Sequence, residues 1–347
     1  MFATPARHNA MLVVGLDIGG ANLKAATSDG AAVDRPFALW KHPERLSSEL
    51  RSLIESLPKA DAIAVTMTGE LADCFVSKAE GVRSIVAAVQ AAADVPVRFW
   101  QTGGEFLVAS DAVELPRLVA AANWHALATF CGRVAPHGPG LLIDIGSTTT
   151  DLIPLLDGQV HSDGMTDLER LRSGELVYSG ATRTPLCAFG STVRVAGNDM
   201  PLAAELFATS RDVHLLLGNL PEDPIDSDTA DGRPATCNFA MARLSRMACS
   251  DPDEIGNEFL HQFAEALAER QRRIINDALE QVLCRLDHPP HVLLSGSGSF
   301  IAERILGDMP NSSFSDVTLL ANLFAKHVAR SACAFAVAKL AAERLTL

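Results

Sequence analysis

Paired metal-ligating and disulfide motifs are missing from this chain of 347 residues. The seven cysteines are odd in number and widely spaced, and no Cys-x-x-Cys pair occurs among them. That spacing argues against a disulfide framework and against a thiolate zinc site. The ten histidines include no His-x-x-x-His pair. We therefore expect reduced thiols, a cytoplasmic location, and structural or surface roles for most of the histidines.

Long apolar runs and an excess of basic residues are missing as well. No apolar run approaches the roughly 20 residues that span a bilayer, and no signal peptide opens the chain. Asp and Glu number 42 against 29 Lys and Arg, a net charge of −13. This balance argues against nucleic acid or an anionic membrane as a partner, although backbone N–H groups can still form a local anion site. The length and the 48% hydrophobic content predict two domains with substantial cores.

Two short stretches repeat one pattern. Residues 15–24 read GLDIGGANLK and residues 142–151 read LIDIGSTTTD. Each is an apolar strand that ends in Asp, followed by a small-residue turn and a second strand. An Asp at a strand end can hold a hydrated divalent cation, and glycine lets backbone N–H groups approach phosphate oxygens. One Asp-Ile-Gly is weak evidence because tight hairpins favour glycine, but the pair predicts a polyphosphate clamp with Mg²⁺.

The clamp assigns a role to each residue type in the two hairpins. Asp17 and Asp144 are the predicted metal ligands. The residues predicted to bind phosphate are Gly19, Gly20, Ala21, Asn22, Gly146, Ser147, Thr148 and Thr149. Lys24 would pair with phosphate oxygens if its side chain faced the ligand, whereas strand alternation also allows a surface lysine. Thr150 is explained by β-propensity alone.

Two further features extend the prediction. The strand 292–295 runs into a turn with Gly296 and Gly298 and then into a helix, which is either a nucleotide cradle or an ordinary tight connection. Glu70 follows Thr68 and Gly69 at the end of a strand, where it is either a general base or an acid at a helix N-terminus. The predicted catalytic residues are Asp17, Lys24, Glu70 and Asp144.

The coarse organisation follows from hydrophobic periodicity. We expect a first domain of residues 11–135 plus 325–347 and a second domain of residues 136–324. Helices are predicted at 46–57, 81–93, 115–134, 202–217, 254–286 and 322–345. Residues 221–234, rich in Asp and Pro, are either a solvated loop or a functional one.

The order of hairpin, hairpin and late glycine-rich turn resembles the superfamily of actin, sugar kinases and the seventy-kilodalton heat-shock chaperones. The resemblance implies an α/β fold with two ribonuclease-H-like domains that face a central cleft. The hydantoinase/oxoprolinase branch is similar, but it usually carries Asp-x-Gly-Gly-Thr where this chain has Ala21 after the glycine pair.

That departure resembles a smaller family, the tetrahydromethanopterin-linked one-carbon transfer pathway proteins. Further stretches match it in order: residues 66–71, 123–124, 176–185, 228–235 and 241–244. Its archaeal members resemble the enzymes that build the methanofuran core. The resemblance implies a transferase that condenses an aminomethylfuran methyl diphosphate with a phenol, either γ-glutamyltyramine or a tyrosine-like acceptor, and releases pyrophosphate.

The resemblance also suggests substrate contacts, since a diphosphate leaving group needs the same Mg²⁺, glycine and hydroxyl clamp as ATP. The candidate substrate residues are Thr68, Asp151, Arg183, Asp231 and Arg233. The two arginines are chosen because their planar forks match a carboxylate or a diphosphate. A homodimer is compatible with the sequence, which fixes no oligomeric state.

Two other classes stay open. An ATP-dependent kinase of a small metabolite would use the turn at residues 295–298 behind adenosine, and ATP would then be its cofactor. A nucleotide-binding regulator of one-carbon metabolism would show no turnover. The released product separates the three: pyrophosphate, ADP or neither.

Overall fold

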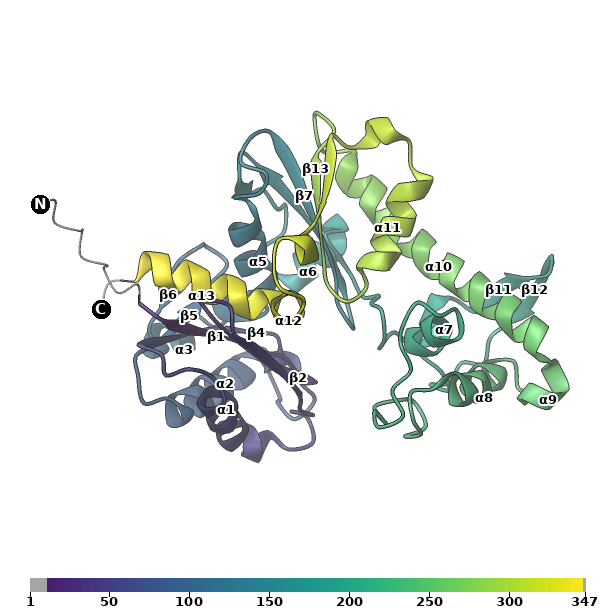
Figure 1. The fold of residues 1–347 in the computed structure, drawn as a ribbon, viewed down its shortest axis with the longest axis horizontal. Helices are drawn as coiled ribbons and strands as arrows, with labels where there is room; N and C mark the ends of the chain where they lie inside the picture. The colour runs from purple at the N-terminus through teal and green to yellow at the C-terminus, as the bar shows by residue number, and fades with distance from the viewer. Residues whose placement is uncertain (1–10, 346–347) are drawn as a thin grey trace, which may run out of the picture. The chain divides into compact units, whose positions relative to one another are not determined.

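The computed structural model describes residues 11–345, apart from the side chains of residues 326 and 327 (Figure 1). The last two residues of the predicted first domain lie outside this range. Contacts divide the described residues into two units. Unit 1 comprises residues 11–140, 155–167 and 318–345, and unit 2 comprises residues 141–154 and 168–317. Residues 136–140, 155–167 and 318–324 thus belong to unit 1, although the sequence placed them in the second domain. The predicted cleft between domains stays a prediction, and each unit is described by itself.

Unit 1 is built on a six-stranded sheet with the order β3-β2-β1-β4-β5-β6. Its strands are β1 (Val13–Ile18), β2 (Asn22–Thr27), β3 (Ala32–Pro36), β4 (Ala62–Met67), β5 (Val97–Trp100) and β6 (Phe106–Leu107). Strands β1, β2 and β3 form an antiparallel meander, whereas β4 lies parallel to β1 and β5 parallel to β4. This order and direction make the ribonuclease-H-like arrangement that the sequence predicted.

The second six-stranded sheet has most of its residues in unit 2. Its order is β10-β8-β7-β13-β14, with β9 paired to β8. The strands are β7 (Pro139–Ile145), β8 (Thr150–Leu156), β9 (Gln159–Val160), β10 (Leu176–Val177), β13 (His291–Ser295) and β14 (Asp316–Leu319). Unit 2 also holds a two-stranded sheet of β11 (Thr192–Val195) and β12 (Asn198–Pro201). The hairpin of β7 and β8 therefore has the same place in its sheet as the hairpin of β1 and β2.

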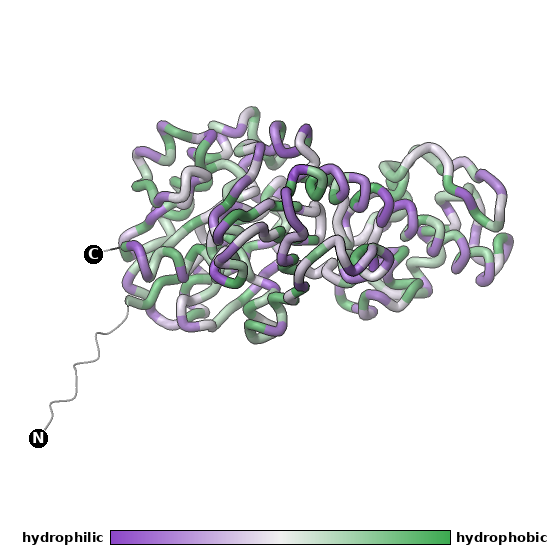
Figure 2. The backbone as a smooth tube through the Cα atoms, turned by 90° about the horizontal axis from the view of Figure 1, so that it is seen from above, coloured by the Kyte–Doolittle hydropathy of each residue, from purple (hydrophilic) through white to green (hydrophobic). Residues whose placement is uncertain are grey.

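Helices surround both sheets. The α-helices that the structure describes are α1 (Leu46–Glu55), α2 (Lys78–Ala92), α3 (Ala109–Glu114), α4 (Pro116–Val119), α5 (Asn123–Cys131), α6 (Asp167–Ser173), α7 (Ser210–Leu216), α8 (Cys237–Met247), α9 (Pro252–Ile255), α10 (Asn257–Leu283), α11 (Ser299–Asp308), α12 (Lys326–Ala329) and α13 (Ala332–Arg344). The short 3₁₀ turns are η1 (Pro43–Arg45), η2 (Gly69–Leu71), η3 (Leu186–Phe189), η4 (Asn311–Ser313) and η5 (Leu320–Asn322). None of the helices in the described range is long and apolar enough to cross a membrane, and hydrophilic residues interrupt the hydrophobic ones along the chain (Figure 2).

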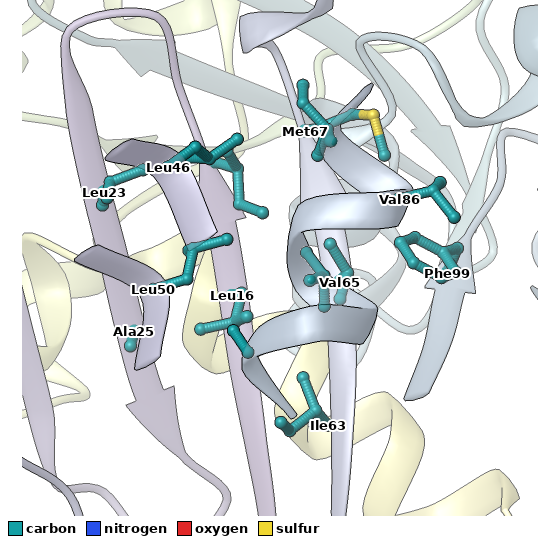
Figure 3. Close-up of a cluster of buried hydrophobic side chains, with 14 of the residues drawn as sticks. Leu16, Leu23, Ala25, Leu46, Leu50, Ile63, Val65, Met67, Val86 and Phe99 are labelled. Atoms are coloured by element: carbon teal, nitrogen blue, oxygen red, sulfur yellow. The ribbon is translucent and has the colours of Figure 1, made fainter. Parts of the chain in front are cut away.

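Alternation along β1 decides what each face of the unit 1 sheet can carry. Leu16 and Ile18 point to the face where α1 and α2 pack, and they join a core with Leu46, Leu50 and Val86 (Figure 3). Gly15 and Asp17 point to the opposite face, where α13 lies against β1. A Cβ atom on Gly15 would collide with the carbonyl oxygen of Ala334 and would lie 2.9 Å from Ala338 N. The alanine-rich helix α13 can therefore approach β1 closely only because residue 15 has no side chain.

Four predicted helices are wrong in extent because local backbone geometry interrupts them. The helix predicted over 115–134 breaks at Ala121, whose φ of 49° lies in the left-handed region, so α4 and α5 are separate. The helix predicted over 254–286 breaks at Gly256, with φ of 81°, into α9 and α10. The segment 322–345 holds the short α12 before α13. The helix predicted from 202 begins only at Ser210, after a capping box formed by Thr209 and Asp212.

The contact between Gly15 and α13 makes a stability prediction. Gly15→Ala should lower the free energy of unfolding by about 2 kcal/mol, because the added methyl group meets backbone atoms rather than a movable side chain. Gly307→Ala is the matched control, since a Cβ atom there meets nothing within 4 Å and residue 307 lies inside α11. That change should leave stability equal or slightly higher. Urea denaturation followed by circular dichroism would measure both, and equal midpoints for the two variants would contradict the packing.

Candidate functional site

Asp17 lies in a row of polar residues that crosses four strands of unit 1. The register places Lys24 directly opposite Asp17, Thr66 beside it on β4, and Asp34 opposite Lys24 on β3. Cross-strand partners share a face of the sheet, so the half-buried Lys24 lies on the same face as Asp17. The sequence alone leaves open which face of the sheet Lys24 occupies. The register of the hairpin shows that Lys24 occupies the face that carries Asp17.

The environment of Asp17 fits a cation. Only 7% of Asp17 is exposed, and its Oδ1 has no hydrogen-bond partner among the described residues. Burial raises the pKa of Asp17, and the positive charge of Lys24 opposes that rise. The hydroxyl of Thr66 is also buried without a partner in the described chain. Hard oxygen atoms of this kind suit Mg²⁺, which binds through one or two carboxylates together with substrate phosphates.

The first turn is held from two sides. The N–H of Gly19 donates to Asn22 O at 3.0 Å and closes the hairpin. The N–H groups of Phe37 and Leu39 donate to Ala21 O and Gly20 O, at 2.9 Å in each case. Gly19 N–H is thus used within the hairpin. The N–H groups of Gly20 and Ala21 make no hydrogen bond within the described residues, so they are the backbone donors that a phosphate could use.

Residues 68 and 69 bring η2 against the same turn. The N–H of Thr68 donates to Ile18 O at 2.9 Å, and a Cβ atom on Gly69 would lie 3.2 Å from Gly19 O. A Cβ atom on Gly19 would in turn lie 3.5 Å from the hydroxyl oxygen of Thr68. The structure therefore places Thr68 beside the first turn.

The second turn, in unit 2, closes in the same way and is braced by residues 176–183, which we call the bracing segment. Gly146 N–H donates to Thr149 O at 2.9 Å. Ala181 N–H donates to Gly146 O at 2.9 Å, and Arg183 N–H donates to Ser147 O at 2.9 Å. A Cβ atom on Gly180 would lie 2.5 Å from Thr148 N. The bracing segment therefore lies against the backbone of the whole turn.

The third glycine turn packs on the end of β7. Gly296 has φ of 89°, and a Cβ atom there would lie 2.7 Å from Oδ1 of Asp144. Gly298 N–H donates to Ile145 O at 2.8 Å. A Cβ atom on Gly298 would lie 3.1 Å from Cβ of Ala181 in the bracing segment. Within unit 2, the structure therefore brings Asp144, the second turn, the bracing segment and the third turn together.

Glu70 is buried rather than presented at a surface. Only 1% of it is exposed, and its Oε2 has no hydrogen-bond partner among the described residues. Burial raises the pKa of Glu70 to about 7. A backbone hydrogen bond from Ala121 acts in the opposite direction and lowers this pKa. Lys78 and Asp167, which form an ion pair at 2.9 Å, act on this carboxyl from nearby. Glu70 therefore changes protonation near neutral pH.

Ion pairs occupy several of the predicted substrate residues. Asp151 pairs with the buried Arg170. Asp231 pairs with Arg243 at 3.0 Å and with Arg246 at 3.2 Å. These contacts give Asp151 and Asp231 structural roles, and their assignment to substrate stays a prediction.

The two predicted substrate arginines have different surroundings. Arg183 NH1 lies 3.7 Å from Asp228 in the 221–234 loop, and its backbone touches the second turn. Arg233 is mostly exposed beside Phe239, with its guanidinium carbon 5.8 Å from the ring centre. Asp226 of the same loop pairs with Arg211 of α7. Charged contacts therefore hold this loop on unit 2, and Arg183 is its link to the second turn.

Sequence reasoning missed the support behind the bracing segment. The amide of Gln271 in α10 donates to Gly180 O at 2.8 Å and to the hydroxyl of Ser179 at 3.1 Å. Its Oε1 lies 2.9 Å from Nε2 of His214, and burial lowers the pKa of His214 to about 4, so this histidine is neutral. No motif marks Gln271, because it lies 91 positions from Gly180.

The family follows from comparison with known proteins. The family model for hydantoinase/oxoprolinase matches residues 61–344. The chain belongs to the hydantoinase/oxoprolinase family. Within it, a protein of Methanocaldococcus jannaschii is 31% identical over 338 residues, which cover 96% of this chain and 99% of that protein. Its name is (4-{4-[2-(γ-L-glutamylamino)ethyl]phenoxymethyl}furan-2-yl)methanamine synthase.

One further relative and one solved structure extend the comparison. A protein of Methanococcus vannielii with the same name is 30% identical over 207 residues, 59% of this chain and 91% of that protein. Both relatives are synthases, so this member of the hydantoinase/oxoprolinase family is related to enzymes over its length. A nucleotide-free structure of acetone carboxylase superposes with a TM-score of 0.57 at 12% identity, over 94% of this chain and 70% of that one. With the strand order of unit 1, this confirms the predicted α/β fold with a ribonuclease-H-like sheet.

The buried carboxyl of Glu70 predicts a pH-dependent stability. Below its ordinary pKa of 4.5 the group is protonated in both the folded and the unfolded chain. Between pH 4.5 and about 7 only the unfolded chain loses the proton, so the folded state loses stability as pH rises, by about 3 kcal/mol in all. Glu70→Gln removes this loss. The free energy of unfolding of Glu70→Gln, relative to that of wild type, should therefore be about 2.5 kcal/mol higher at pH 8 than at pH 5.

Urea denaturation at both pH values would measure that difference. Glu55→Gln, an exposed position on α1, is the matched control and should follow the wild-type pH dependence. A gain for Glu70→Gln that does not depend on pH would show that the carboxyl is ionised in the folded protein.

Proposed function

We propose that this protein is a transferase that joins an aminomethylfuran methyl diphosphate to the phenol of γ-glutamyltyramine or of a tyrosine-like acceptor. The observation that carries the proposal is the similarity to the Methanocaldococcus jannaschii synthase over 96% of the chain. The name of that enzyme describes an aminomethylfuran whose methylene group is joined to a phenol oxygen. The proposal transfers this ether-forming activity to the present chain.

The reaction balances without an external redox partner. The phenol oxygen forms a bond to the methylene carbon of the furan, and the bond from that carbon to the diphosphate oxygen breaks. Pyrophosphate leaves with the electron pair of the broken bond, and the phenolic proton passes to a base. The methylene carbon is activated by the furan ring, so the protein has to hold the diphosphate, stabilise the leaving charge and accept the proton.

The second turn supports the role of holding the diphosphate. The hydroxyls of Ser147 and Thr148 lie at the turn, 3.4 Å apart, and both turns begin with a glycine, Gly146 here and Gly19 in the first. Arg183 is bonded through its backbone to Ser147, so its guanidinium starts from beside the turn. An arginine fork can donate two hydrogen bonds to a diphosphate. We assign these residues, with Gly146 and Thr149, to the diphosphate.

Carboxylates in both units supply the remaining proposed roles. Asp17 in unit 1 and Asp144 in unit 2 are each assigned as a ligand of Mg²⁺, which would neutralise charge on a diphosphate. Lys24, opposite Asp17, would add positive charge beside that carboxylate. Glu70 has a pKa of about 7, in the range of a general base that works near neutral pH, but its carboxyl is buried in this structure. It would accept the phenolic proton only after residues 69–71 expose that carboxyl.

An ATP-dependent kinase is the second candidate. The observation that favours it is the third glycine turn, because Gly296 and Gly298 lie against Asp144 and Ile145. A turn in that place could lie behind a nucleotide. The same glycines are also needed for packing at the end of β7, so the turn alone does not require a nucleotide.

The product identifies the reaction. Wild-type protein incubated with Mg²⁺, synthetic aminomethylfuran methyl diphosphate and γ-glutamyltyramine, tyramine or tyrosine should yield an aryl ether and one pyrophosphate per ether. Mass spectrometry would detect the ether, and a coupled assay would count the pyrophosphate. Removal of Mg²⁺ with a chelator should abolish both. ADP release from ATP without an ether would support the kinase instead.

The two strand-end carboxylates should be needed for turnover more than for folding. Asp17→Asn and Asp144→Asn should each reduce turnover roughly a hundredfold or more, because each removes charge from the proposed metal and diphosphate site. Asp277→Asn, an exposed change on α10, is the matched control and should retain wild-type turnover. Thermal unfolding would verify that all three variants fold. Wild-type turnover in either strand-end variant would remove that residue from the site.

A further inference from the structure

Tyr178 is the single tyrosine of the chain, and it is 65% exposed within the bracing segment. The pairing of β10 with β8 places Leu176 opposite Asp151 and Val177 opposite Thr150. Continued by one residue, this antiparallel register brings Tyr178 opposite Thr149. The bracing segment thus carries an aromatic residue near Thr149 by its register and Arg183 bonded through its backbone to Ser147.

The backbone under Tyr178 is fixed on both sides. Val177 belongs to the strand ladder, and Ser179 O accepts a hydrogen bond from the buried hydroxyl of Thr150 at 2.7 Å. Gln271 holds the hydroxyl of Ser179 from α10. A ring that is exposed on such a fixed backbone can bind a flat ligand with little loss of side-chain entropy.

We propose that Tyr178 stacks on the furan ring of the diphosphate substrate and thereby selects a ring-bearing diphosphate. The inference rests on the proposed function. One methylene group separates the furan from its diphosphate, so a diphosphate held at Ser147–Thr149 brings the furan within a few ångströms of the turn. Tyr178 lies at that distance from the turn through its register with Thr149. Arg183 would hold the charged end of the same substrate.

Calorimetry in the presence of Mg²⁺ and without the phenol tests this role. The probes are aminomethylfuran methyl diphosphate, dimethylallyl diphosphate, which has no aromatic ring, and pyrophosphate. Tyr178→Leu should weaken binding of the furan compound about three- to tenfold and leave pyrophosphate unchanged. Tyr178→Phe should bind all three as wild type does. Leu206→Ala removes a comparably exposed apolar side chain of unit 2 and is the matched control.

Steady-state kinetics gives the second readout. Tyr178→Leu should raise KM for the furan diphosphate by the same factor and leave KM for the phenol unchanged. Equal weakening of pyrophosphate would show damage to the turn and would overturn the proposal. Wild-type affinity of Tyr178→Leu for the furan compound would also overturn the proposal. So would a variant that binds the furan compound as wild type does but binds ADP, tested as an additional ligand, more weakly. A wild-type protein that binds the furan compound but forms no ether with any phenol would refute the proposed reaction and not the stacking.

Discussion

Backbone contact around the two hairpin turns is the constraint on which the rest of this structure depends. Gly69 lies against Gly19, Gly180 lies against Thr148, and Gly296 lies against Asp144. A Cβ atom at any of these glycines would come within about 3 Å of backbone or of the carboxylate of Asp144. The segments that follow β4, β10 and β13 can therefore reach the turns only as glycine. Tight packing alone therefore requires glycine at these three positions.

The two hairpins are equivalent in their own geometry and different in their support. The first turn is held by residues 37–39 and 68–69. The second is held by residues 180–183, which lie no farther along the chain from their turn than residues 68–69 do from theirs, and by residues 296–298, which come from far along the sequence. A large buried network of Gln271, His214 and Ser210 stands behind Gly180.

The sequence predicted the parts of the fold that depend on short-range pattern. Apolar alternation ending in Asp located β1 and β7, and the register then put Lys24 beside Asp17. It failed where a distant residue decides local backbone. Ala121 is left-handed and its N–H bonds to the carboxyl of Glu70, so a run with good helix propensity is split. Gln271 was missed for the same reason, because its partners lie 91 and 92 residues away.

Fold and family constrain the chemistry to different degrees. Acetone carboxylase shares the fold at 12% identity, and a shared fold at that level leaves the reaction open. If the turns bind phosphate as proposed, they would not distinguish ATP from a furan diphosphate. The residues that distinguish the two would have to contact the part of the substrate beyond the phosphates. The bracing segment, which holds the second turn and contains Tyr178 and Arg183, is where the proposed specificity should be sought, rather than in the glycine motifs.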